Sequence, residues 1–194
     1  MRTGVYERNT NETNVKISLH LDKQAPSKIN TGIGFFDHML ELLAFRAGLT
    51  LEISCQGDLH IDGHHTVEDI GICLGRALVA ALGDKSGISR YGTAWIPMDE
   101  SLVQAVLDIS GRGFLVYNAT LPSPKVGNFE TELTEEFFRA LAHNAGITLH
   151  INLTYGTNTH HIIEAMFKAL GCALGQAIKK TDTNIISSTK GVLV

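Results

Sequence analysis

A short histidine-rich segment occurs twice in the chain and indicates that the chain contains two copies of one unit. Residues 64–68 read HHTVE (the first box), and residues 160–164 read HHIIE (the second box). The similarity continues outside the boxes, since residues 47–53 (AGLTLEI) correspond to residues 145–151 (AGITLHI). Self-similarity of this kind predicts the duplication of a structural unit of roughly 90 residues.

Each copy has the pattern of an α+β unit. Apolar residues alternate in residues 12–19 and 100–107, which is the period of a half-buried strand. Helices are predicted at residues 36–45 and 135–144, and Gly48 and Gly146 can end them in the left-handed conformation. Each box begins a further helix that is apolar over most of its circumference, so these helices should be buried between sheets or subunits.

The expected fold class is therefore α+β with an internal duplication. Each half, residues 1–88 and 89–194, should supply about four strands and two helices on one face of its sheet. Neither half is expected to be stable alone, because one face would lack cover. We expect one compact domain with the helices between the sheets, and a Gly-rich, candidate mobile loop at residues 83–92 between the halves.

The boxes contain residue types that bind metal ions. On a helix, the histidines and the glutamate of each box occupy neighbouring positions of one face. Imidazoles with a carboxylate suit Zn, Mn, Fe, Co or Ni. With one histidine from the preceding helix of each half, the candidates suffice for two sites of three imidazoles and one carboxylate. The candidate ligands are His38, His64, His65, Glu68, His143, His160, His161 and Glu164. Which histidines share a metal stays open, because adjacent histidines diverge and one box could serve two metals.

Composition restricts the partners and the compartment. The net charge is -4 and the pI is near 6.1, which gives no electrostatic reason to expect nucleic acid or an anionic membrane as a partner. The N-terminal residues contain no apolar stretch typical of a signal peptide, and no apolar run approaches the ~20 residues of a membrane span. Three cysteines without a C-x-x-C pair favour a reducing, cytoplasmic location.

Several motifs together make the chain similar to a known family along essentially its whole length. They are residues 8–13 (RNTNET), 34–40 (GFFDHML), 62–69 (DGHHTVED), 98–101 (MDES), 160–164 (HHIIE) and 187–191 (SSTKG). On these motifs the chain resembles the monofunctional imidazoleglycerol-phosphate dehydratases of histidine biosynthesis. The resemblance implies a duplicated half of the ribosomal protein S5 domain 2-like type. It also implies trimers assembled into a 24-mer, with two Mn²⁺ per active site at subunit interfaces.

The same resemblance implies a reaction, the dehydration of D-erythro-imidazole glycerol phosphate to imidazole acetol phosphate. The C–H bond that breaks has no activating carbonyl, so a base alone is insufficient. A substrate imidazolate bound to metal could expel the hydroxyl through a diazafulvene-like intermediate. The resemblance places Glu12 in the substrate site, where a carboxylate could act as acid and base. Its repeat partner, Glu100, gives no independent support for catalysis.

The phosphate of such a substrate requires cationic and hydrogen-bonding partners. Candidates are Arg90 in the linking loop, Arg112 in a Gly-Arg-Gly segment, and Ser188 and Lys190 in the C-terminal tail. Arg8, Arg46 and Lys168 are weaker candidates. His20, His60 and His150 lie outside the repeated pattern and are interpreted as surface or strand residues.

Two other classes of protein could use the same residues. A dinuclear metallohydrolase would activate water with similar ligands, but such enzymes are usually richer in bridging Asp or Glu. A metal-storage or structural oligomer would carry its ligands on four long helices. The present pattern has strands and short helices, and a metal store would not need phosphate-binding Arg and Lys. A dehydratase therefore remains the main hypothesis.

Overall fold

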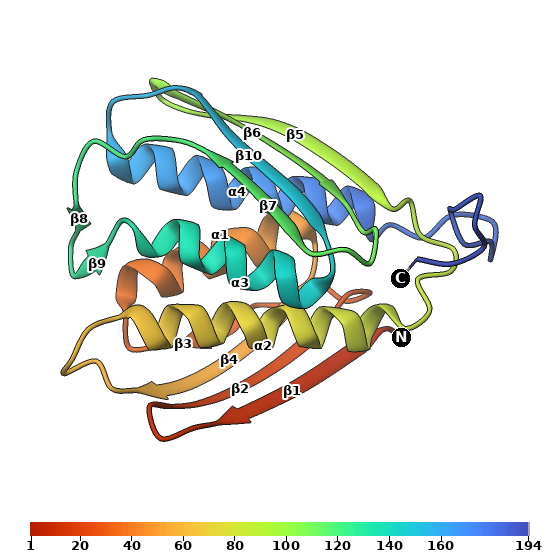
Figure 1. Cartoon of the computed structure of the whole chain (residues 1–194), viewed down its shortest axis with the longest axis horizontal. Helices are drawn as coiled ribbons and strands as arrows, with labels where there is room; N and C mark the ends of the chain where they lie inside the picture. The colour runs from red at the N-terminus through yellow and green to blue at the C-terminus, as the bar shows by residue number, and fades with distance from the viewer. Residues whose placement is uncertain (194) are drawn as a thin grey trace.

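The computed structural model describes residues 1–193 of the 194-residue chain. It has three layers, with one four-stranded sheet on each side and four helices between the sheets (Figure 1). This arrangement confirms the predicted α+β fold. None of the helices in the described residues is both long and apolar enough to span a membrane.

The two sheets have the same topology. The first has the order β1-β2-β4-β3 and the second the order β5-β6-β10-β7. Neighbouring strands are antiparallel, except that β3–β4 and β7–β10 are parallel. The strands of the first sheet are β1 (Thr3–Asn9), β2 (Thr13–His20), β3 (Lys28–Asn30) and β4 (Thr50–Gly57). Those of the second sheet are β5 (Tyr91–Met98), β6 (Ser101–Asp108), β7 (Phe114–Asn118) and β10 (Thr148–Tyr155). A small hairpin of β8 (Lys125–Val126) and β9 (Phe129–Glu130) completes the strands.

The helices follow the predicted pattern. They are α1 (Gly34–Ala47), α2 (His64–Leu82), α3 (Leu133–Ala145) and α4 (Thr159–Ala177). Gly48 and Gly146 follow α1 and α3 with φ of 70° and 62°, so both predicted helix ends are confirmed. The boxes lie in the first turns of α2 and α4, as predicted.

Helices from the two halves pair crosswise in the middle layer. The helix α1 of the first half packs on α4 of the second, and α2 packs on α3. Phe137 stands at the centre, with its ring centroid 5.3 Å from that of Phe36 and 5.2 Å from that of Phe167. Each half therefore buries its helices against helices of the other half.

All four helices begin at the same end of the molecule. Gly63, just before α2, lies against side chains of Ile33 before α1 and Leu133 at the start of α3. The ring of His160 at the start of α4 is 5.1 Å from that of Phe35 in α1. We call this the box end. The opposite end, where the helices finish and the C-terminal segment lies, is the tail end (Figure 1).

One strand of each sheet approaches its covering helix very closely. A Cβ atom at Gly4 in β1 would lie 1.9 Å from the carbonyl oxygen of Ala77 in α2. In the second half, a Cβ atom at Gly92 in β5 would lie 1.8 Å from the carbonyl oxygen of Ala173 in α4. Only glycine, which has no Cβ atom, allows the two backbones to lie this close. The two contacts therefore set the distance between each sheet and the helix that begins with a box.

The outer faces of the two sheets differ in chemistry. In the first sheet, Glu7 on β1 forms an ion pair with Lys16 on β2 at 2.5 Å. At the corresponding register of the second sheet, Trp95 on β5 stands opposite Gln104 on β6. Trp95 is 53% exposed. Asp108 is the only charged residue in the four strands of the second sheet, whereas the strands of the first contain several.

The close approach of β5 to α4 leads to a stability prediction. Gly92→Ala should lower the free energy of unfolding by about 1–3 kcal/mol or more, because the new methyl group overlaps the carbonyl oxygen of Ala173. Gly34→Ala is the matched control, since a Cβ atom there meets nothing within 4 Å. Chemical denaturation at equal protein concentration measures both variants. Equal denaturation midpoints for Gly92→Ala and the unmodified chain would contradict the packing argument.

Candidate functional site

The second histidine of each box is held by a carboxylate at its Nδ1 atom. The Nδ1 of His65 lies 3.0 Å from Oδ2 of Asp58, and the Nδ1 of His161 lies 2.7 Å from Oε2 of Glu100. A proton shared with a carboxylate places the N–H on Nδ1 and directs the Nε2 atom of each ring away from that carboxylate. Histidines that bind metals commonly have this arrangement.

These contacts also shift the pKa values of the groups involved. The hydrogen bond to Asp58 raises the pKa of His65, and the hydrogen bond to Glu100 raises the pKa of His161. In return, the hydrogen bond from His161, followed by that from the backbone N–H of Asn158, holds the pKa of Glu100 far below its usual range. Glu100 is therefore ionised at neutral pH.

Glu12 and Glu100 occupy equivalent turns, before β2 and β6, yet their surroundings differ. Oε1 of Glu100 accepts hydrogen bonds from the backbone N–H groups of Thr157 and Asn158, at 3.1 and 2.7 Å. Oε1 of Glu12 instead lies 3.7 Å from Nε2 of His65, and within residues 1–193 its carboxylate makes no hydrogen bond. Glu12 is thus a half-exposed carboxylate whose oxygens, unlike those of Glu100, are not engaged by backbone N–H groups in the described residues.

The glutamates of the two boxes also differ. Glu164 is buried, with its Oε2 atom 3.2 Å from Nε2 of His160 and 3.7 Å from Nε2 of His38. Its Oε1 atom lies 2.5 Å from Nζ of Lys168. Glu68 is half-exposed and lies 3.9 Å from Nε2 of His64. The fold therefore brings His38, from the first half, to the second box.

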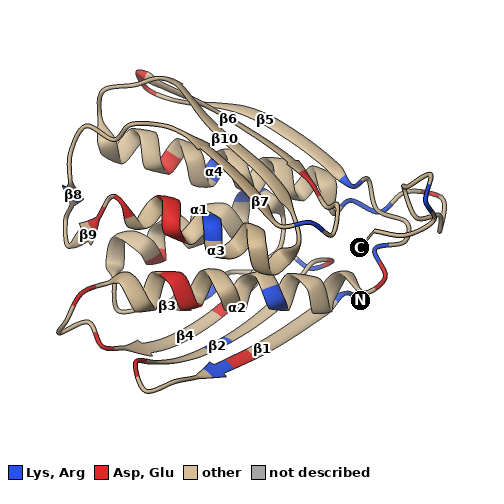
Figure 2. Cartoon of the chain, viewed as in Figure 1, with Lys and Arg blue, Asp and Glu red and all other residues tan. Residues whose placement is uncertain are grey.

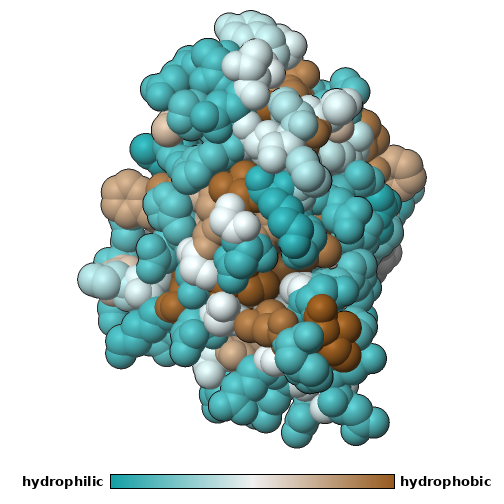
Figure 3. All heavy atoms as spheres, turned by 90° about the vertical axis from the view of Figure 1, so that its left-hand side faces the viewer, coloured by the Kyte–Doolittle hydropathy of each residue, from teal (hydrophilic) through white to brown (hydrophobic). Residues whose placement is uncertain are grey.

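The predicted ligands do not all meet within one chain. His143 is exposed on the last turn of α3, against Gly113, and so lies away from both boxes. Among residues 1–193, no group of three or more His, Cys, Asp or Glu side chains is arranged to hold a metal ion. The donor types and the orientation of His65 and His161 nevertheless fit a divalent metal, because their Nε2 atoms are directed away from the orienting carboxylates. Figure 3 views this end of the molecule, where hydrophilic residues surround smaller apolar patches.

A second feature lies at the tail end. A pocket of about 690 Å³ is lined by four residues that the sequence indicated as phosphate ligands, namely Arg90, Arg112, Ser188 and Lys190. Lys and Arg residues gather around this end in Figure 2. The linking loop contacts the tail here, because Nη1 of Arg90 donates to the carbonyl oxygen of Ser187 at 2.6 Å.

Arg90 is fixed in the wall of this pocket. Its Nε and Nη2 atoms donate to the two carboxylate oxygens of Asp108 at 2.7 and 2.9 Å. With the bond to Ser187, three of its five N–H donors are used and two remain for an anion. The side chains of Arg112 and Lys190 make no hydrogen bond to other residues in the described part of the chain. The pocket can therefore offer several N–H donors to an anion.

The remaining basic candidates lie elsewhere. Arg8 donates to Asp69 at 2.7 Å, and Lys168 is paired with Glu164. The guanidinium of Arg46 lies over the ring of Phe45, 5.7 Å from its centroid. None of the three lines the tail-end pocket. Their predicted contacts with phosphate stay predictions.

Three acidic residues were not proposed as site residues from the sequence, namely Asp58, Asp108 and Asp69, although Asp69 ends the motif of residues 62–69. Each occurs in only one half of the chain, so a comparison of the repeats could not detect it. Their roles depend on contacts between different strands, loops and helices, made with partners 7, 18 and 61 residues away in the sequence, respectively.

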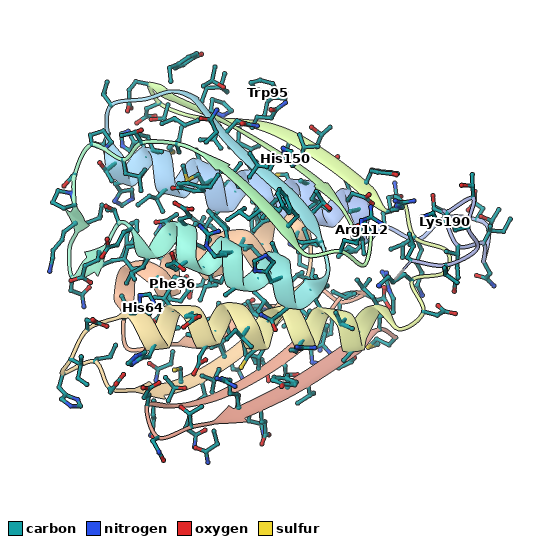
Figure 4. All side chains as sticks on the ribbon, in the orientation of Figure 1. Phe36, His64, Trp95, Arg112, His150 and Lys190 are labelled. Atoms are coloured by element: carbon teal, nitrogen blue, oxygen red, sulfur yellow. The ribbon has the colours of Figure 1, made fainter. Side chains whose placement is uncertain are left out.

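The box end and the tail-end pocket are far apart in one chain. The helix α2 begins with the first box and has 19 residues, which corresponds to about 27 Å. Figure 4 shows His64 at the start of this helix, whereas Arg112 and Lys190 lie toward the opposite end of the molecule. Within one chain, a small molecule that touches one group does not reach the other.

Comparisons with known proteins agree in one description. A family model for imidazoleglycerol-phosphate dehydratase (IGPD) matches residues 31–174. Imidazoleglycerol-phosphate dehydratase from Heliobacterium modesticaldum is 58% identical over 100% of both chains, and that from Exiguobacterium sp. is 54% identical over 98% of both. A crystal structure of the Staphylococcus aureus protein of this name has a TM-score of 0.85 and 51% identity, covering 92% of this chain and 99% of that one. IGPD from Pyrococcus furiosus also gives 0.85, with 37% identity over 97% and 100% of the chains.

Proposed function

The chain belongs to the imidazoleglycerol-phosphate dehydratase family, and we propose that it works as a metal-dependent homo-oligomer with active sites between copies. It is a hydro-lyase of histidine biosynthesis. The reaction removes water from D-erythro-imidazole glycerol phosphate and gives imidazole acetol phosphate. Because this substrate joins an imidazole ring to a phosphorylated three-carbon chain, its site needs partners for both parts.

The observation that carries this proposal is the separation of the two candidate parts of the site. The boxes offer imidazole and carboxylate groups, and the tail-end pocket offers N–H donors for a phosphate. About 27 Å of α2 separates them, which the substrate cannot span. Contact between the box end of one copy and the tail end of another would unite them, and the trimers and 24-mer implied by the family are assemblies of this kind.

The outer face of the second sheet supports association with a second copy. Trp95, Tyr155 and Phe114 are each more than half exposed on this sheet, and Asp108 is the only charged residue in its strands. Interface cores are depleted of charged residues and enriched in aromatic ones. The equivalent face of the first sheet carries the Glu7–Lys16 ion pair and resembles ordinary surface.

Divalent ions, with Mn²⁺ as the expected metal, would act as Lewis acids toward the substrate's imidazole ring when bound. The side chains proposed to hold two such ions per site are His38, His64, His65, Glu68, His143, His160, His161 and Glu164. In one copy, Asp58 and Glu100 orient two of these rings, and His143 stands apart from the boxes. A further copy is therefore the proposed source of the missing ligands.

Glu12 is the proposed acid and base. Its carboxylate is half-exposed beside His65, so it can take the proton of the substrate's C–H bond and return a proton on ketone formation. Arg90, Arg112, Ser188 and Lys190 would hold the phosphate and thereby fix the substrate's position relative to Glu12. A dinuclear hydrolase has no such support, because the relatives quoted above share the dehydratase name. The three free cysteines and the biosynthetic role favour the cytoplasm.

Metal removal should abolish both activity and assembly, because the ligands come from several helices of more than one copy. Treatment with a chelator should give an inactive, smaller species, and added Mn²⁺ should restore size and turnover. Sedimentation, metal analysis and product formation measure the three properties. Full oligomer size and activity in metal-free protein would refute this part of the proposal.

Mixing two inactive variants tests whether active sites form between copies. His65→Ala removes a box ligand and Arg112→Ala removes a phosphate ligand, and each variant alone should be inactive or nearly so. After joint dissociation and reassembly with Mn²⁺, about a quarter of randomly mixed sites should pair an intact box end with an intact pocket. Turnover should therefore reappear. No recovery in demonstrably mixed oligomers would place each site within one chain.

Glu12→Gln should lower kcat by about 100-fold or more with little effect on KM, because the amide keeps the shape but cannot transfer the proton. Metal content and oligomer size should stay the same, since Glu12 is not proposed as a ligand. Steady-state kinetics with metal analysis measure these effects. An unchanged kcat would assign Glu12 to the solvated surface.

A further inference from the structure

We infer that Glu100 and Asp58 are positioning residues, which fix the tautomer of His161 and His65 so that each Nε2 atom carries the lone pair used as a metal ligand. This inference rests on the proposed metal-dependent function. Glu100 is the repeat partner of Glu12, the proposed acid and base. In this inference Glu100 does not transfer a proton but orients a metal ligand. The inference also includes Asp58, which has no counterpart in the second half.

When the imidazole of His161 is neutral, its surroundings allow only Nδ1, and not Nε2, to carry the proton. Glu100 has both carboxylate oxygens engaged: Oε1 faces the N–H donors of Thr157 and Asn158, and Oε2 lies 2.7 Å from Nδ1 of His161. A carboxylate oxygen can only accept, so Nδ1 must donate. A neutral imidazole with its proton on Nδ1 has its free lone pair on Nε2.

The first half achieves the same result with a different residue. Nδ1 of His65 lies 3.0 Å from Oδ2 of Asp58, which comes from the loop between β4 and α2. Asp58 is largely buried, and within residues 1–193 its other oxygen has no hydrogen-bond partner. Because Asp58 orients the ring, the equivalent of Glu100 in this half, Glu12, is not needed for that purpose.

The two halves have therefore diverged in a way that explains their different glutamates. Glu100 is bound to His161 and to the backbone before α4, so it is not available for proton exchange. Glu12 has no such contacts and faces the Nε2 side of His65 at 3.7 Å. One of two equivalent carboxylates positions a ligand, and the other remains free to act on a substrate.

Glu100→Gln is a selective test because the backbone determines how the new amide lies. Only the carbonyl oxygen of Gln can accept from Thr157 and Asn158, so the NH₂ group must face Nδ1 of His161. Nδ1 then has to accept, the proton moves to Nε2, and the ligand lone pair is lost. The contacts that hold the loop before α4 are kept, which separates positioning from a purely structural role. Glu12→Gln is the matched control, since it makes the same chemical change at the equivalent turn without contacting Nδ1.

Two measurements on the full chain test whether Glu100 and Asp58 orient the two histidine rings. Solid-state NMR of ¹⁵N-histidine-labelled, metal-free protein should show His161, assigned with His161→Asn, with its proton on Nδ1 in the unmodified chain and on Nε2 in Glu100→Gln. Mn²⁺ titration, with free Mn²⁺ followed by electron paramagnetic resonance, should show roughly 10- to 100-fold weaker binding in Glu100→Gln and in Asp58→Ala. Glu12→Gln should keep the His161 tautomer of the unmodified chain and lose less Mn²⁺ affinity than Glu100→Gln.

The outcomes separate this inference from the proposed function. An unchanged tautomer of His161 in Glu100→Gln, or unchanged Mn²⁺ affinity in both Glu100→Gln and Asp58→Ala, would overturn the positioning role while leaving the metal-dependent reaction intact. If the unmodified chain bound no Mn²⁺, the metal part of the proposed function would fail, and with it the ligand role inferred here. The tautomer change on its own would then describe only the hydrogen bonding of His161.

Discussion

The crosswise pairing of helices is the constraint on which the rest of the structure depends. Each sheet is covered on one face only, so α1 needs α4 and α2 needs α3 to complete the apolar middle layer. The two helices of each pair are parallel, and all four helices begin at the box end. This shared direction gathers both histidine boxes at that end and leaves the basic pocket at the other.

Much of the fold could be predicted because the duplication repeats the local signals. Alternating apolar residues identified β2 and β6, the glycines at 48 and 146 identified two helix ends, and the boxes identified the starts of α2 and α4. The pocket residues Arg90, Arg112, Ser188 and Lys190 were also found, although they come from three separate segments of the chain. Their roles, like those of the metal candidates, stay predictions.

Other features depend on three-dimensional contacts that the repeat does not contain. Asp58 and Asp69 act in the first half only, and Asp108 in the second, so no comparison of the halves could reveal them. His143 was grouped with His38, yet it lies in the last turn of α3 whereas His38 lies near the start of α1. A displacement of two helical turns moves a side chain by about 10 Å along the helix axis. Within one chain, His143 is therefore too far away to bind the same ion as His38.

The outer face of the second sheet gives the molecule an internal optical reporter. The chain contains one tryptophan, and Trp95 is half exposed on the sheet whose strands contain a single charged residue. Indole fluorescence shifts to shorter wavelength when water around the ring is replaced by apolar groups. Any molecule that covers this face therefore changes the emission colour of the whole protein. Without an added label, the rate at which the face is covered or exposed could be followed in real time.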